Sequence, residues 1–452
     1  MGTSRVTQPL DGVRVVDLSQ GISGPYCTKL LADFGADVIK VEKPGTGDYA
    51  RQMGPFPGDV PHDEKSGLFL HLNTNKRSIV VDLKSDGGVE LVKELVRGAD
   101  VLVENFRPGV MEGLGLDYAT LEKINPNLVM TSISNFGQTG PYRDYLASEL
   151  TLFGMGNRMH SLGLPEKYPI RLGASHVQYQ AGNVGAMTTL FALQGRDHKE
   201  MGGQHIDISI FETQMASGNI RMSNLVGYQY TGERSRRRGE AAGRGYPIGW
   251  YTCKAGYVNV NAGGNRWHMA VSLLGMPELL EDPRFAPPDG QRSQEGKEEF
   301  ERSIFLPWLM DRTGIEVMEE CQEHEIPSVV VRNIAQVVDE NPQFDARKYF
   351  VEINHPEAGN IRYPGAPIFN TNDWWSIKRP APTLGEHTRE VLQGGFENDV
   401  QDSSQSKDSV VASASHVGMK TEDTRSPRRN KKRLPLEGLR VIDFTFVVQG
   451  PY

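Results

Sequence analysis

The sequence has 452 residues, of which 38% are hydrophobic and 23% charged, and its formal net charge is −8. This composition is typical of a globular protein, and the negative net charge argues against nucleic acid as a partner, because nucleic-acid-binding domains usually carry a basic surface. One hydrophobic core rarely serves more than roughly 250–300 residues, so we expect at least two lobes.

The first predicted elements alternate between strand and helix. Residues 13–18 are a short β-branched run, residues 26–36 carry apolar positions at helical spacing, and residues 38–42 are a second β-branched run. A strand, a helix and a strand within about 30 residues are typical of a βαβ unit, in which a right-handed crossover joins parallel strands.

The alternation continues along the first half of the chain. Further strands are predicted over 78–83, 100–105, 128–134 and 205–212, the last running into a helix, and further helices over 87–99 and 180–195. Such alternation predicts an α/β fold with a Rossmann-like open parallel sheet.

The amino-acid composition changes after about residue 230, where a basic, glycine-rich stretch leads into predicted strands rich in aromatic residues. This change predicts a second, smaller α+β domain. We expect a large domain over 8–228 to which 345–395 returns, a small domain over 229–344, a flexible, serine-rich linker over 396–433, and the start of a second large domain over 434–452.

The evidence for that second domain is an internal repeat. Residues 10–26 read LDGVRVVDLSQGISGPY and residues 436–452 read LEGLRVIDFTFVVQGPY, so Leu, Gly, Arg, Val, Asp, Gly, Pro and Tyr recur at matching positions. We therefore expect the sequence to be a piece of a tandem protein, with a second domain of the same kind as its partner.

Six segments together resemble a known family. They are LDGVRVVDLSQGISGPY, LLADFGADVIKVEKPGTGD, LNTNKRSIVVDL, VENFRPGVMEGLGLDY, SISNFGQTGPYRD and APTLGEHTREVL. In this order they resemble the motif series of the family III CoA-transferases, a superfamily that includes carnitine and formyl-CoA transferases and α-methylacyl-CoA racemases. The resemblance covers residues 8–395. It implies a Rossmann-like large domain, a small domain, a homodimer of interlocked subunits, and coenzyme A or acyl-CoA as cosubstrate with a small carboxylate as substrate.

Coenzyme A carries phosphates that require cationic and amide donors. Arginine offers a planar fork for phosphate and lysine a point charge, and ligands of open α/β sheets bind at the carboxyl ends of strands. The segment NTNKRS is read as a compact donor cluster after a short strand; its charged residues could instead be solvated loop charges. By resemblance, seven residues are expected to line the CoA site: Lys43, Asn73, Asn75, Lys76, Arg77, Asn105 and Arg107.

The nucleophile position departs from the family. Family members use an aspartate, in a segment resembling G-A-S-x-x-D-Y-x-A-G, whose carboxylate attacks the acyl-CoA thioester and later carries coenzyme A itself. Here the segment 173–182 reads GASHVQYQAG, so Gln178 occupies the aspartate position. No catalytic residue is therefore expected in this half. Glu149 is the alternative nucleophile, Asp207 is read as structural, and His176 as a base or an ordinary hydrogen-bonding residue.

A degenerate half joined to a second half resembles the tandem enzymes that transfer CoA from acetyl-CoA to dimethylsulfoniopropionate and release dimethyl sulfide. We therefore expect a CoA-transferase whose working nucleophile lies in the second domain, while the isolated chain is inactive. The alternative is a non-catalytic, CoA-binding or scaffold half of a tandem CoA-transferase with a carnitine-like or dicarboxylic acid substrate.

The cysteines and the N-terminus predict a cytoplasmic protein without a membrane segment. The three cysteines, Cys27, Cys253 and Cys321, are far apart, which argues against a disulfide framework. No apolar run approaches the ~20 residues of a membrane-spanning helix, and the N-terminus lacks the apolar core of a signal peptide. Cys321 and His324 have helical spacing but no companion ligands, so no metal is expected.

Overall fold

The computed structural model describes two compact units of the chain. The described residues are 8–216, 219–234, 237, 245–372, 374–396 and 434–442. The first unit comprises Met1–Gly156, Leu172–Leu225 and Tyr349–Tyr452, and the second comprises Asn157–Arg171 and Val226–Lys348. The division differs from the expected boundaries mainly in Asn157–Arg171, which belongs to the second unit, while the other two boundaries lie three and four residues from those expected at 228 and 345. Of the expected linker over 396–433, residues 397–433 lie outside the described residues.

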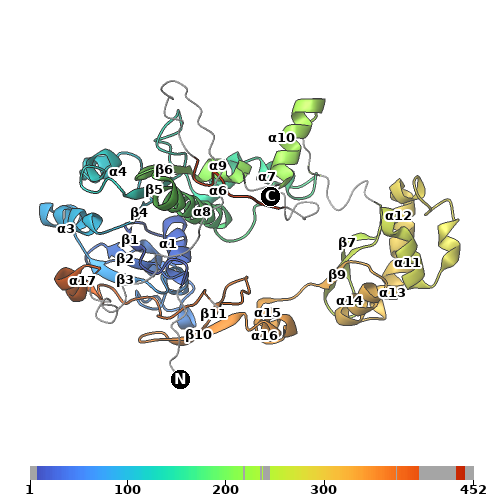
Figure 1. Ribbon diagram of the computed structural model, residues 1–452. Coiled ribbons are helices and arrows are strands. Elements are labelled where there is room, and N and C mark those ends of the chain that lie inside the picture. The colour runs from blue at the N-terminus through green and yellow to red at the C-terminus, as the bar shows by residue number, and fades with distance from the viewer. Residues whose placement is uncertain are drawn as a thin grey trace, which may run out of the picture. The chain divides into compact units, whose positions relative to one another are not determined.

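The first unit is built on a six-stranded parallel sheet in the order β3-β2-β1-β4-β5-β6 (Figure 1). Its strands are β1 Arg14–Asp17, β2 Asp37–Glu42, β3 Arg77–Val80, β4 Val101–Glu104, β5 Val129–Ser134 and β6 Gln204–Ser209. The order runs outward in both directions from β1 and β4, as in a doubly wound Rossmann-like sheet. The predicted fold class is therefore confirmed.

Helices of the first unit cover both faces of this sheet. They are α1 Ser23–Asp33, α2 Gly67–Leu72, α3 Asp86–Arg97, α4 Val110–Gly113, α5 Tyr118–Leu121, α6 Glu149–Met155, α8 His176–Lys199, α9 Ile210–Ala216 and α17 Thr388–Gly394. Helices α1 and α8 pack closely together, and a Cβ at Gly182 would lie 2.6 Å from the carbonyl oxygen of Ser23. This close approach requires glycine at position 182.

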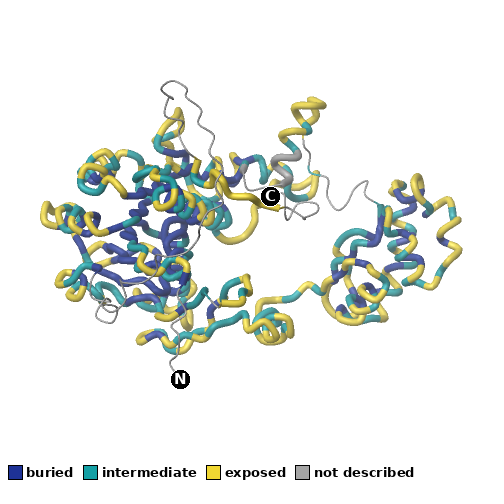
Figure 2. Tube along the Cα trace, viewed as in Figure 1, coloured by how far each residue is buried: buried dark blue, intermediate teal, exposed yellow. Residues whose placement is uncertain are grey.

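The opposite face is covered by α3, α4, α5 and α17, which share one apolar cluster with the strands. Helix α3 illustrates why these segments fold as they do. Ser85 caps its first turn by accepting a hydrogen bond from the N–H of Gly88 at 3.1 Å. Its apolar stripe of Val92, Leu95 and Val96 is buried against the sheet. Figure 2 shows the buried residues concentrated along the strands and the helix faces turned toward them.

The C-terminal part of the first unit adds an antiparallel hairpin of β10 (Phe350–His355) and β11 (Gly359–Pro364). Tyr363 of this hairpin and Ile377 share a small core with Phe69 and Leu70 of α2. The hairpin and the segment around Ile377 therefore pack with α2 in the first unit.

The second unit is an α+β arrangement around a three-stranded antiparallel sheet, β7-β8-β9. Its strands are β7 Ile248–Thr252, β8 Tyr257–Asn261 and β9 Ser328–Val330. Its helices are α7 Arg158–Ser161, α10 Asn219–Thr231 from Val226 onward, α11 Trp267–Leu274, α12 Gln294–Phe300, α13 Leu306–Met310, α14 Gly314–Glu323, α15 Ile334–Asp339 and α16 Pro342–Ala346. An aromatic core that includes Trp267, Phe300 and Phe305 packs α11, α12, α13 and α14 against the sheet.

The two copies of the repeat have different environments. Val15 and Val16 of the first copy are completely buried in β1, whereas the matching Val441 and Ile442 are 86% and 77% exposed. The described part of the second copy, 434–442, forms a turn and no strand, and its remaining residues lie outside the described range. Within the described parts of the chain, no helix has the length and apolar character to cross a membrane.

Candidate functional site

A cavity opens in the first unit where the sheet order reverses. Loops from the carboxyl ends of β1, β4 and β5 supply Ile22, Asn105 and Asn135 to its wall. Strand order reverses between β1 and β4, and ligands of doubly wound sheets bind in the crevice outside the strands at this point. The topology alone therefore marks this cavity as the first candidate for a binding site.

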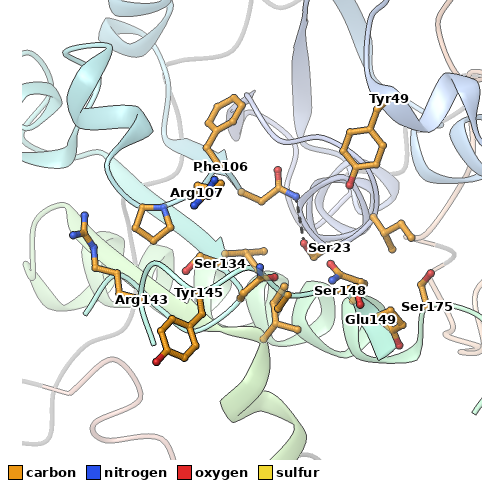
Figure 3. Close-up of a pocket in the computed structure, with 18 of the residues that line it drawn as sticks. Ser23, Tyr49, Phe106, Arg107, Ser134, Arg143, Tyr145, Ser148, Glu149 and Ser175 are labelled. Atoms are coloured by element: carbon orange, nitrogen blue, oxygen red, sulfur yellow. Dashed lines mark hydrogen bonds between the residues drawn. The ribbon is translucent and has the colours of Figure 1, made fainter. Parts of the chain in front are cut away.

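The cavity encloses about 310 Å³ and has a mixed apolar and polar lining (Figure 3). Apolar side chains come from Ile22, Met53, Ile133 and Ile210. The polar and charged side chains are Ser23, Tyr49, Asn105, Arg107, Ser134, Asn135, Arg143, Tyr145, Ser148, Glu149, Ser175 and Gln178. In Figure 3, Arg107 and Arg143 lie toward one end of the cavity and Glu149 and Ser175 toward the other. The cavity therefore has a cationic end and an end that carries a carboxylate.

Asn105 fixes the loop that follows β1. Its side-chain oxygen accepts a hydrogen bond from the N–H of Gln20 at 2.8 Å, and its amide nitrogen donates to the carbonyl of Gln20 at 2.7 Å. The same nitrogen donates to the hydroxyl of Ser23 at 3.3 Å, the contact drawn in Figure 3. Asn105 thus lies at the cavity, as the sequence predicted for a ligand site, but its amide is largely committed to positioning the loop.

The other wall near β1 is shaped by Tyr49 and Gly21. Gly21 has φ of +76°, and a Cβ there would lie 1.8 Å from the hydroxyl of Tyr49, so the tyrosine lies directly over the glycine. Asp48 holds both segments, because its carboxylate accepts from the N–H groups of Gly21 and Ala50, each at 2.8 Å. Any side chain at position 21 would push Tyr49 off the cavity wall.

The cationic end is formed by two arginines. Among the described residues, the Arg107 guanidinium forms no ion pair or hydrogen bond, and the Arg143 guanidinium is paired only weakly with the exposed Asp144, at 3.8 Å. An arginine without a carboxylate partner presents its planar fork to whatever enters the cavity. This end can therefore receive a carboxylate or a phosphate.

Gln178 lies on the first turn of α8 and lines the cavity. Its side-chain amide forms no hydrogen bond with the described residues and is half-buried. Glu149 is the one acidic residue among the described residues that line this cavity, and its carboxylate accepts a hydrogen bond from the N–H of Val177 at 2.9 Å. A carboxylate at the start of a helix is stabilised as an anion by the free N–H groups there.

The donor cluster predicted over 73–77 has a different position from the one expected. It follows helix α2 and ends in Arg77, the first residue of β3, so it does not follow a strand. Asn73, Asn75, Lys76 and Arg77 are at most 6% exposed, and none of them lines the cavity. The correction has a local cause: Ser66 accepts from the N–H of Phe69 at 3.2 Å and starts a helical turn in a segment read as a strand.

Each of these four side chains is bonded inside the protein. Lys76 donates to Thr28 at 2.7 Å and to Asp17 at 3.1 Å, and also to the side chain of Asn73 at 2.9 Å. Asn75 donates to Asp33 at 2.8 Å. Arg77 forms ion pairs with Asp37 and, at 2.9 Å, with Glu390. Lys43, after β2, is exposed and lines neither of the two cavities described for this unit.

Asp17 is the centre of this buried network. Lys40 lies 4.0 Å from Asp17 and pairs with Asp48 at 2.8 Å. The side chains of these three residues and of Lys76 are inaccessible to water. Burial alone would raise the pKa of Asp17, but the charges of Lys76 and Lys40 and hydrogen bonds from Ser19 and Thr28 lower it to about 2. Because Asp48 also holds Gly21, the network supports the cavity wall from beneath.

The sequence did not single out Arg143, Tyr145 or Tyr49. Arg143 lies within the motif SISNFGQTGPYRD, which served only to establish the family resemblance. The rule that selected Asn105 and Arg107, a polar residue shortly after the carboxyl end of a strand, also applies to the segment after β5 and would have found Ser134 and Asn135.

The remaining expectations concern residues away from the first cavity. Asp207 accepts a hydrogen bond from the N–H of Gln138 at 2.9 Å, a contact that orders the loop after β5. Cys321 is buried, and its pKa is raised to about 11 by burial. The described residues contain no group of three or more His, Cys, Asp or Glu side chains able to hold a metal ion.

Comparisons with known proteins agree with this geometry. The family model of CoA-transferase family III matches residues 10–388. The chain is 33% identical to the succinyl-CoA–D-citramalate CoA-transferase of Chloroflexus aurantiacus, over 87% of this chain and 95% of that one. It is 33% identical to the formyl-CoA:oxalate CoA-transferase of Afipia carboxidovorans, over 91% and 98%, and 32% identical to the human succinyl-CoA:glutarate CoA-transferase, over 85% and 86%.

Solved structures share the fold. The crystal structure of a CAIB/BAIF family protein from Brucella suis matches with a TM-score of 0.74 and 29% identity, over 86% of this chain and 99% of that one. The structure of Rv3272 from Mycobacterium tuberculosis matches with a TM-score of 0.70 and 27% identity, over 85% and 99%.

Proposed function

The chain belongs to CoA-transferase family III, and we propose that its own cavity binds the acyl-CoA cosubstrate without forming the covalent intermediates of the transfer. The protein is thus a CoA-transferase for small carboxylic acids in which this part of the chain has a binding role. The observation that carries the proposal is the neutral amide of Gln178 in the cavity, at the family's nucleophile position.

The covalent step requires a carboxylate. An enzyme carboxylate oxygen attacks the thioester carbonyl, which expels CoA thiolate and leaves a mixed anhydride. The thiolate then attacks the enzyme-side carbonyl, the donor acid leaves as a carboxylate, and the enzyme holds CoA as a thioester. The amide of Gln178 has no anionic oxygen to begin this sequence, so it can donate to or accept from a bound carbonyl but does not form the anhydride.

Among the described residues that line the cavity, Glu149 is the only carboxylate that could replace the missing nucleophile. One of its oxygens is bonded to the N–H of Val177 at the start of α8. The helix N-terminus stabilises the charged carboxylate and so makes it a weaker nucleophile. We assign Glu149 the task of fixing the first turn of α8, which carries Gln178, relative to α6.

For coenzyme A and the carboxylic acids, we propose Arg107 and Asn105 as direct contacts and Lys43 as a more distant positive charge. Arg107 forms no ion pair or side-chain hydrogen bond with the described residues and suits a phosphate or a carboxylate, Asn105 borders the same cavity, and Lys43 follows β2 without lining the cavity. The internal hydrogen bonds of Asn73, Asn75, Lys76 and Arg77 give those residues a supporting role instead.

The working carboxylate then has to come from a second domain of the same kind, because a second copy of this part of the chain would again carry Gln178 at the nucleophile position. The recurrence of the 10–26 pattern at 436–452 supports the tandem arrangement. Such a domain would supply the aspartate that Gln178 replaces here.

As substrate we propose dimethylsulfoniopropionate, with CoA transferred from an acyl-CoA such as acetyl-CoA and dimethyl sulfide released. The arginine end of the cavity suits the carboxylate, and the exposed rings of Tyr49 and Tyr145 suit a sulfonium cation. The relatives' names, which specify D-citramalate, oxalate and glutarate, favour the alternative of a dicarboxylic acid, and a carnitine-like acid is also compatible with both ends.

Intact-protein mass spectrometry after incubation with acetyl-CoA or succinyl-CoA tests the covalent step. The chain as it stands is expected to acquire no CoA adduct, Gln178→Asp to acquire one, and the matched control Gln178→Asn to acquire none. An adduct on the unsubstituted chain that disappears in Glu149→Gln would overturn the proposal and identify Glu149 as the nucleophile.

The substrate is tested separately by headspace detection of dimethyl sulfide from the full-length protein, supplied with acetyl-CoA and dimethylsulfoniopropionate. Release that requires both compounds supports the assignment. Transfer of CoA to glutarate or carnitine without release of dimethyl sulfide would replace it with the alternative.

A further inference from the structure

A second cavity of about 480 Å³ lies beside the first in the same unit. Arg107 and Arg143 line both cavities and are the only residues common to the two linings, so they form the wall between them. The rest of the second cavity is lined by residues from two parts of the segment after β4, by Gln138, and by side chains of β4, β5 and β6. The residues after β4 are Gly109, Met111, Glu112 and 117–119. The proposed function uses Arg107 from this lining and assigns no role to the residues that line the second cavity alone.

The second cavity carries opposite charges on different parts of its lining. Arg107 and Arg143 belong to the shared wall, whereas Glu112 and Asp117 line the second cavity alone. Among the described residues, none of Arg107, Glu112 and Asp117 forms an ion pair. Charges of both signs that face one cavity and do not neutralise each other favour a ligand that carries both signs itself.

The carboxylate of Asp117 is fixed in place and supplies one of the negative charges. It caps α5, accepting from the N–H of Thr120 at 3.1 Å and from its hydroxyl at 2.7 Å. Partial burial raises the pKa of Asp117, but these hydrogen bonds outweigh it and the pKa lies below its usual value. The carboxylate is therefore ionised near neutral pH and points from a fixed helix start.

The floor of the cavity is polar and holds one further acid, Glu104, whose pKa is raised to about 7 by burial, so this carboxyl is only partly ionised near neutral pH. Ser132 lies 2.9 Å from the ring nitrogen Nε2 of His205, and the ring of His205 stacks on Tyr118 at 5.5 Å. Burial lowers the pKa of His205, so its imidazole is neutral near pH 7 and does not repel a cation. Apolar surface comes from Met111 and Met130.

We propose that the second cavity binds a small zwitterion, whose carboxylate is received by Arg107 and Arg143 and whose cationic group lies toward Asp117, Glu112 and Tyr118. A simple carboxylate would leave the two acids without a partner, and a simple cation would leave the two arginines without one. The volume is within the usual range of ligand pockets, roughly 300–1,000 Å³. This inference concerns binding at a second site and does not rest on the proposed function of the first.

The test is isothermal titration of the chain with three probes: glycine betaine, propionate and choline. Glycine betaine joins a carboxylate to a quaternary ammonium group, propionate has the carboxylate alone, and choline the ammonium alone. Glycine betaine is expected to bind about threefold to fivefold more tightly than either single-charge probe, since each charge pair at a partly exposed site contributes up to about a factor of five.

The decisive variant is Asp117→Asn. Asparagine caps a helix as well as aspartate does, so the change removes the charge and keeps the fold. The substitution is expected to weaken the binding of glycine betaine about threefold to fivefold and to leave the affinity for propionate unchanged. Glu112→Gln, at an exposed position, should act in the same direction. The matched control is Glu122→Gln, which removes an exposed acid outside both linings and should change nothing.

Gln178→Leu, which alters only the first cavity, locates the binding. Unchanged affinity for glycine betaine in Gln178→Leu supports the second cavity. Loss of binding in that variant, equal affinities for glycine betaine and propionate, or no heat at tens of millimolar probe would each overturn the inference. Circular dichroism of Asp117→Asn, matched to the unsubstituted chain, verifies that the fold is retained.

Discussion

Two groups of charged side chains in the first unit differ in what neutralises them. In the buried network, Lys40 and Lys76 are bonded to Asp17 and Asp48 and have no contact with water. At the cavity wall, Arg107 has no carboxylate partner among the described residues. A lysine or arginine in a family motif is thus a candidate ligand contact only where the chain has not already supplied its counter-charge.

Removing a cation from the buried network is expected to have the largest effect on stability. Lys40→Met leaves Asp48 and Asp17 buried with one counter-charge fewer, and the free energy of unfolding is expected to fall by about 3–5 kcal/mol. Urea denaturation measures it. The matched control Lys43→Met, on an exposed neighbour, should change stability by less than about 0.5 kcal/mol. Equal effects of the two substitutions would show that the network carries no stability.

Glu104 is a buried acid between the two groups, at the end of β4, and it lines the second cavity. Burial raises its pKa to about 7, against hydrogen bonds from Ser132 and the N–H of Phe106 that lower it. From about pH 4.5 to 7 the folded protein keeps a proton that the unfolded chain has lost, so this residue makes stability decrease as pH rises through that range.

Glu104→Gln is therefore expected to stabilise the protein at pH 8 by about 2 kcal/mol, since one pKa unit corresponds to about 1.4 kcal/mol and neighbouring groups relax. At pH 4 the substitution should have little effect, because the carboxyl is protonated in both states. Thermal unfolding of both proteins at the two pH values measures the difference. A pH-independent change of stability would mean that the carboxyl has the same pKa in the folded and the unfolded chain.

The cavity wall should show the opposite behaviour. Arg107→Gln is expected to weaken binding of acetyl-CoA or a small carboxylate about tenfold, because a charge-assisted contact is lost. Stability should change by less than about 0.5 kcal/mol, since no internal partner is left behind. Titration calorimetry and urea denaturation measure the two quantities. Arg97→Gln, on the exposed surface of α3, is the control. A large loss of stability would reveal that Arg107 has a structural role.

The same distinction explains what the sequence could predict. The strands around β1, β2, β4 and β5 were predictable because β-branched runs alternate with amphipathic helices, and the carboxyl-end rule then led to Asn105 and Arg107. The role of Lys76 was not predictable, since its partners Asp17 and Thr28 are distant in sequence and meet it only in the folded chain. Segment 67–72 was not assigned as a helix because its start depends on one cap, Ser66.

Lys43 belongs neither to the buried network nor to the cavity wall, and its substitution has the smallest expected effect on binding. It is exposed, follows β2, and lines neither cavity, so its charge acts on coenzyme A only through solvent. Lys43→Ala should weaken binding of coenzyme A about twofold at 0.05 M salt. At 0.5 M salt the effect should vanish, because screening then acts within a few ångströms. A loss greater than tenfold that persists at high salt would instead mean that Lys43 touches a phosphate directly, and that an exposed lysine can complete the site without lining its cavity.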